Sequence, residues 1–185
     1  MTARIGALIA VIALAVGCSG SSQSTVDSNK ALGKARNFTG FPLYWAGTNV
    51  GDLPFTGVSS FSEHLGEAYN FDYGTCEVSD GADTCADPLS IQVTALCNRL
   101  PKDLGIGHLS NVRLRGARTS DAEAGADNGA SISLYVKGAT ITIYGSHALV
   151  LAAVRALRGA NHLADTPAGK PLPAATEREI AGEGC

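Results

Sequence analysis

The sequence predicts an α+β domain: a mainly antiparallel sheet of five to six strands with one main C-terminal helix packed on one face. Three patterns lead to this prediction. Apolar and polar residues alternate in several short segments, which is the strand period. A hairpin with its turn at Lys137-Gly138 would pair apolar residues with apolar residues and polar residues with polar ones. After Ser146 the apolar residues recur with the period of a helix.

Alternation predicts the strands and their connections. Four segments show it: residues 41–46, 69–73, 89–95 and 112–115. Residues 47–67 contain Gly, Asn, Asp and Pro, so we expect a long connection with one short helical turn near residues 62–65. Residues 119–130 are rich in Gly, Ala and Asp, which is typical of a surface loop.

The hairpin prediction specifies a register. With Lys137-Gly138 at the turn, Val136 lies opposite Ala139, and matched pairs continue to Ser131 opposite Tyr144. A slip of one residue would place apolar side chains against polar ones. One face of the hairpin should therefore be buried and the other solvated.

The helix prediction rests on its ends and its apolar stripe. Ser146 fits an N-cap, residues 148–157 are good helix formers, and Gly159 fits a C-cap. The segment Thr176-Glu-Arg-Glu179 matches a capping box and predicts a short additional helix.

The N-terminus predicts export. One basic residue, Arg4, precedes twelve apolar or small residues. A helix of that length spans about 18 Å, too short for a hydrocarbon core of about 30 Å. Residues 1–17 are therefore predicted to be a signal peptide, residues 18–37 a flexible tether, and residues 38–185 a single disulfide-stapled domain.

The end of the signal, Ala15-Val16-Gly17-Cys18, resembles the lipobox of bacterial lipoproteins. The resemblance implies that Cys18 is acylated, as in palmitate-bearing lipoproteins, and anchors the protein to the outer face of the cytoplasmic membrane or cell envelope. The family usually carries Leu where this chain has Ala15. The alternative is ordinary cleavage after Ala15, which would release a soluble protein.

Five cysteines predict a disulfide framework once Cys18 is lipidated. Four cysteines then remain, which permit three pairings. Cys76 and Cys85 stand where two strands meet one loop, so we predict a Cys76–Cys85 bridge and, by elimination, Cys97–Cys185. Acidic residues in that loop leave calcium as the alternative, but the spacing of a calcium loop is missing. We predict no metal and no cofactor.

The polar side of the predicted sheet is the candidate binding surface. Its candidate residues are Arg113, Arg115, Tyr135 and Tyr144, and the alternative is an ordinary solvated face. Tyr44 and Trp45 form a separate aromatic pair, for which a ligand-facing position and a core position are the two alternatives. A hydroxyl-rich platform with cations suits an envelope protein or an anionic glycan. Removal of Arg4 leaves 13 Lys and Arg against 17 Asp and Glu, a net charge of −4, which argues against nucleic-acid binding.

The sequence offers no catalytic residues that we can identify. A G-x-S-x-G turn is missing, and Ser146-His147 are neighbours in sequence that point in different directions. We therefore expect a non-catalytic binding or structural module. The alternative is an exported hydrolase or envelope-modifying enzyme with an unrecognised site.

A longer pattern runs from Tyr73-Gly-Thr-Cys76 through Cys85-Ala-Asp-Pro88 and Cys97 to Tyr135-x-Lys-Gly-x-Thr140. It resembles a family of exported proteins of GC-rich actinobacteria that has no established activity. The resemblance covers about residues 41–158 and implies a cellular setting without implying a mechanism.

Overall fold

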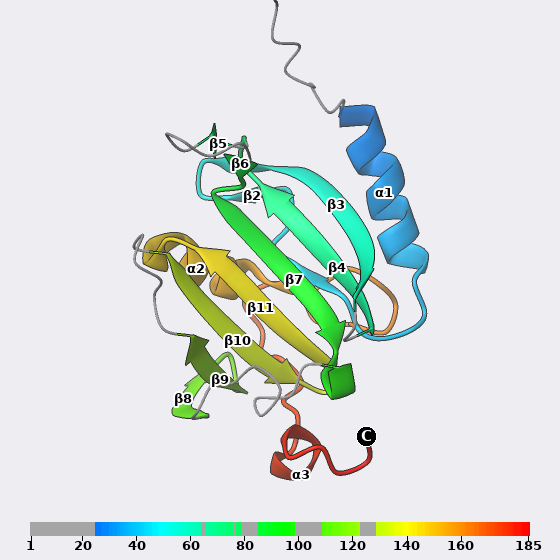
Figure 1. The fold of residues 1–185 in the computed structure, drawn as a ribbon, viewed down its shortest axis with the longest axis vertical. Helices are drawn as coiled ribbons and strands as arrows, with labels where there is room; N and C mark the ends of the chain where they lie inside the picture. Colours follow the sequence, from blue (N-terminus) through cyan, green and yellow to red (C-terminus); the bar gives the residue numbers. More distant parts are fainter. Residues whose placement is uncertain (1–24, 64–65, 76, 79–84, 99–108, 123–128) are drawn as a thin grey trace, which may run out of the picture.

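The computed structural model describes residues 25–63, 66–75, 77–78, 85–98, 109–122 and 129–185. These residues are mostly β structure, built around one antiparallel sheet of eight strands (Figure 1). In space the strands follow the order β2-β3-β4-β7-β11-β10-β9-β8. Their bounds are β2 (Asn49–Val50), β3 (Leu53–Glu63), β4 (Gly66–Tyr73), β7 (Leu89–Ala95), β8 (Ser110–Leu114), β9 (Ala117–Ala122), β10 (Ala130–Val136) and β11 (Ala139–Gly145).

Smaller elements surround the sheet. Two short antiparallel pairs join β1 (Tyr44–Trp45) to β12 (Arg158–Gly159) and β5 (Glu77–Val78) to β6 (Cys85–Ala86). The helices are α1 (Thr25–Asn37), α2 (His147–Ala156) and α3 (Glu177–Ile180), with a 3-10 turn η1 (Leu96–Asn98). None of the described helices is long and apolar enough to cross a membrane.

The predicted fold class is wrong. The protein is mostly β, with an eight-stranded sheet in place of five to six strands, and no single main C-terminal helix covers it. The helix that follows Ser146 has ten residues, and α3, nearest the C-terminus, has four. Ser146 is the N-cap, as predicted, but its side chain makes no cap hydrogen bond, and the C-cap is Leu157 rather than Gly159.

Two segments predicted to be loops contain strands. Residues 53–63 form the eleven-residue β3, in which Pro54 stands near the start and the register shifts between Phe55 and Gly57. A bulge absorbs one extra residue, so turn-forming residues can sit inside a strand. Ser62 belongs to this strand rather than to a helical turn, and β9 occupies the first part of the loop predicted over residues 119–130.

The hairpin register is confirmed. Val136 pairs with Ala139, and the matched pairs continue to Ser131 opposite Tyr144. The strand predicted at residues 89–95 coincides with β7, which lies between β11 and β4 at the centre of the sheet. Period-two patterning therefore located the centre of the sheet and the edge strand β8, whereas β2, β3 and β9 were missed.

The apolar face of the sheet carries the core. Its central side chains are fully buried: Phe71, Leu89, Ile91, Val93, Leu134, Ile141 and Ile143. Helix α2 lies behind the sheet in Figure 1 and adds Val150, Ala153 and Val154 to this core. The β1 segment closes the same side, where the Tyr73 hydroxyl accepts a hydrogen bond from the Ala46 amide at 2.8 Å.

A helix precedes residue 38. Helix α1 runs beside β3 (Figure 1) and buries Leu32 and Ala35 in the main core. Residues 25–37, which were predicted to belong to the tether, form this helix. The two apolar side chains lie three residues apart, which places them on one helix face.

The C-terminal segment closes one end of the sheet. Ala174 forms a bridge with Val136, and the Lys137 amide donates to the Pro173 carbonyl at 2.7 Å. The predicted capping box is present, with Thr176 and Glu179 each bonding the other's backbone amide. A disulfide between Cys97 and Cys185 ties the terminus to the end of β7, which confirms that predicted pair.

Candidate functional site

The sheet face opposite the core is lined by polar residues, and we call it the polar face. Strand pairing places its members in two rows across β10, β11, β7 and β4. The first row contains Ser131, Tyr144, Ser90 and Asp72; the second contains Ser133, Thr142, Gln92 and Asn70. Because directly opposed residues of antiparallel strands point to the same side, each row is one line of neighbouring side chains.

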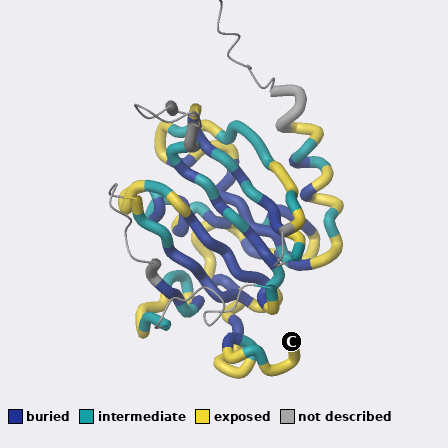
Figure 2. The backbone as a smooth tube through the Cα atoms, in the orientation of Figure 1, coloured by how far each residue is buried: buried dark blue, intermediate teal, exposed yellow. Residues whose placement is uncertain are grey.

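Burial increases along the polar face. Tyr144 is 37% exposed and Ser90, Ser131 and Asp72 are partly buried, whereas in the second row Ser133 and Thr142 are buried (Figure 2). A third row, with Tyr135, Thr140 and Thr94, is buried throughout. Polar side chains buried in this way need hydrogen-bond partners.

Some of these groups have partners. The hydroxyls of Ser133 and Thr142 bond each other at 3.0 Å, and those of Ser120 and Tyr135 at 2.8 Å. The Ser90 hydroxyl donates to Asp72 Oδ1 at 2.8 Å. The β9–β10–β11 side of the polar face is therefore internally bonded.

Three neighbouring acceptors are left without a partner in the described structure. They are Asn70 Oδ1, Gln92 Oε1 and Thr94 Oγ1, all buried. Asn70 and Gln92 are cross-strand partners, and Thr94 follows Gln92 on the same side of β7. An unpaired buried polar atom costs on the order of 1–3 kcal/mol, so three of them in one place need a reason.

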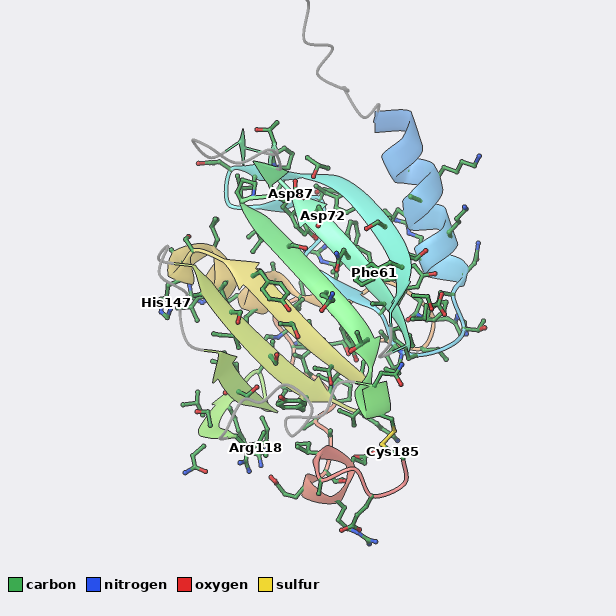
Figure 3. The ribbon with its side chains drawn as sticks, in the orientation of Figure 1. Phe61, Asp72, Asp87, Arg118, His147 and Cys185 are labelled. Carbon is green, nitrogen blue, oxygen red and sulfur yellow. A yellow bond between two sulfur atoms is a disulfide. The ribbon has the colours of Figure 1, made fainter. Side chains whose placement is uncertain are left out.

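Two carboxyl groups lie near the open end of the polar face, on β4 and just before β7 (Figure 3). Burial raises the pKa of Asp72, the Ser90 hydrogen bond opposes this, and the charge of Asp87 adds to it. Burial also raises the pKa of Asp87. The two carboxyl groups are therefore close enough to affect each other's ionisation.

Aromatic side chains stand at two corners of the polar face. Tyr144 lies on β11 in the exposed first row. Phe61 lies on β3, opposite Ala68, and is partly exposed (Figure 3). The three unpaired acceptors lie on the strands between them.

The two predicted arginines do not form a cationic platform. Arg115 stands in the β8–β9 turn with a φ of 52°, and its guanidinium donates to the backbone carbonyls of Val154 and Leu157, at the end of α2, and of Pro167 and Lys170. Arg113 is 51% exposed and lies 3.5 Å from Glu177. The alternating pattern predicted that Arg113 and Arg115 share one face of a strand. Because the chain turns after Leu114, Arg115 leaves the strand and the two side chains do not lie side by side.

Three of the predicted aromatic residues are inside the protein. Tyr44 is fully buried in the main core, where burial raises its pKa and Thr166 and Arg115 oppose the shift. Trp45 is 9% exposed and meets Phe55 edge-on at 5.4 Å. Tyr135 is covered by Ala175 and Ile180 of the C-terminal segment. Of the predicted surface, Arg113 and Tyr144 are exposed.

Several predicted features lie outside the described residues. They include the lipidation site Cys18 and the Cys76–Cys85 pair, of which Cys76 is not described. His64 and His108 also lie there, while His147, at the start of α2, and His162 are exposed. Within the described ranges, His, Cys, Asp and Glu side chains form no group that could hold a metal.

Sequence reasoning missed Asn70, Gln92, Thr94 and Phe61. The signal for the first three was present, since each alternates with the apolar residues of β4 or β7. The alternating pattern does not show that β4 pairs with β7, and this pairing is what brings Asn70 next to Gln92. Phe61 was missed because its strand was interpreted as a connection.

Comparison with protein-family models, with curated proteins and with solved structures finds no match to this chain.

Proposed function

We propose that this protein is a membrane-anchored, non-catalytic binding module of the bacterial cell envelope, and that it binds through the polar face. The observation that carries the proposal is the group of three unpaired acceptors on Asn70, Gln92 and Thr94. A ligand that donates to them offsets a cost that the free protein bears.

The signal and the lipobox-like sequence support the anchor. Acylation of Cys18, with two or more chains, would hold the protein stably at the outer face of the membrane. Cys18→Ala should move the protein from the membrane fraction to the soluble exported fraction. Persistence of that variant in washed membranes would contradict the anchor.

The binding part of the proposal is tested with isolated envelopes of the producing bacterium. The Cys18→Ala protein, which lacks the anchor, should co-sediment with unwashed envelopes, and adding Gln92→Leu and Thr94→Val should reduce its retention about tenfold. Arg113→Ala, on the edge strand β8 four strands away from β7, is the matched control and should bind normally. Equal retention of all three proteins would overturn the assignment of the polar face.

A further inference from the structure

We propose that the polar face binds a neutral, polyhydroxylated ligand, an oligosaccharide without acidic groups, lying across β11, β7, β4 and β3. This inference rests on the proposed function and adds the chemical class of the ligand. It replaces the anionic glycan predicted from the arginines.

Hydrogen-bond chemistry favours hydroxyl groups. Asn70 Oδ1 and Gln92 Oε1 can only accept, and Thr94 Oγ1 can accept or donate. The partly buried Asp72 carboxylate, which already accepts from Ser90, offers further acceptor capacity beside them. Sugar hydroxyls donate to such acceptors and can also accept from the Ser and Thr hydroxyls of the same face.

Charge argues against an anionic ligand. Asp72 and Asp87 place two interacting carboxyl groups at one end of the polar face. The nearest described cation along the rows is Arg118, opposite Tyr135, and it is paired with Glu177 at 2.6 Å. Arg115 is engaged with backbone carbonyls. Arg113 and Arg118 share the Glu177 carboxylate and lie on β8 and β9, three or more strands away from β7. An acidic ligand lying across β11, β7, β4 and β3 would therefore meet the two carboxyl groups without a cation beside it on these described strands.

The aromatic corners suggest an extended ligand. Sugar rings carry apolar C–H faces that stack on aromatic rings, and Tyr144 and Phe61 supply such rings. Three strand spacings and four residues of rise separate the two positions, which is about 20 Å in all. A single sugar could not reach both, so the proposed ligand is an oligomer.

The test uses glycans released from the envelope of the producing bacterium and separated on an anion exchanger into neutral and acidic fractions. Binding of the full chain to each fraction is measured by calorimetry. The neutral fraction should bind and should compete with whole envelopes. Thr94→Val and Tyr144→Ala should each weaken that binding about tenfold, and Arg113→Ala should leave it unchanged.

The outcomes separate this inference from the proposed function. Binding confined to the acidic fraction, or reduced by Arg113→Ala, would overturn the neutral ligand while leaving the binding module intact. Retention on whole envelopes without binding to either glycan fraction would show that the partner is not a glycan. Failure to bind whole envelopes would remove both proposals.

Discussion

The two faces of the central sheet use the same strands for opposite purposes. On the apolar face, Phe71, Ile91, Val93 and Ile141 are completely buried. On the polar face, three acceptors one or two positions away along the same strands are buried and unpaired. One face therefore contributes most of the stability, and the other retains groups that cost stability.

This contrast shows where to look for function when the fold alone does not indicate it. Packing explains the apolar face completely, because its side chains exclude water and contact one another. Packing does not explain Asn70, Gln92 and Thr94. Groups that remain unexplained by stability are candidates for binding.

The largest effect should come from the disulfide that closes one end of the polar face. Replacing Cys97 and Cys185 together by Ala opens a loop of 88 residues. The free energy of unfolding should fall by about 4 kcal/mol, because the unfolded chain regains the closure entropy. Urea unfolding measures this, and a loss below about 1 kcal/mol would mean that the bridge is not formed in the protein.

The second prediction compares the stability cost of a substitution on the buried apolar face with that of a substitution on an exposed position. Ile141→Ala leaves a cavity in the fully buried apolar face and should lower the free energy of unfolding by about 3 kcal/mol. Ser59→Ala, on the exposed part of β3, is the control and should change it by less than about 0.5 kcal/mol. Similar losses for both variants would contradict the division between the faces.

The third effect tests the reassignment of Arg115. Arg115→Ala removes charge-assisted hydrogen bonds to the carbonyls at the end of α2 and should cost about 2 kcal/mol. Arg113→Ala removes one exposed ion pair and should cost less than about 0.5 kcal/mol. Thermal unfolding of the two variants distinguishes them. A larger loss for Arg113→Ala would contradict the structural role of Arg115.

A smaller effect should appear as a pH dependence. The folded-state pKa of Asp72 is raised, so its favourable contribution is complete below the ordinary Asp value near 3.8 and is lost as pH rises through the folded value. Asp72→Asn should therefore be relatively more stable than the parent protein at pH 7 than at pH 3. Parallel stability profiles for the two proteins would contradict the raised pKa.

The sequence predicted what depends on local pattern. The hairpin around Gly138, the strand at residues 89–95, the capping box at Thr176 and the bridge at Cys185 were all correct. The long strand β3 was missed because Pro54 and Gly57, which lie at its start and at its bulge, are residues typical of loops. The candidate site was mostly missed because pairing of distant strands assembles it, and the period of a single strand carries no information about its neighbour.

The most direct test of the central claim compares two threonines of the polar face by chemical unfolding. Thr142 is hydrogen bonded to Ser133, whereas Thr94 Oγ1 has no partner among the described residues. Thr142→Val should lower the free energy of unfolding by about 1 kcal/mol, and Thr94→Val should leave it unchanged or raise it. If Thr94→Val lowers the free energy of unfolding as much as Thr142→Val does, the claim that the Thr94 hydroxyl is unpaired and available to a ligand would be contradicted.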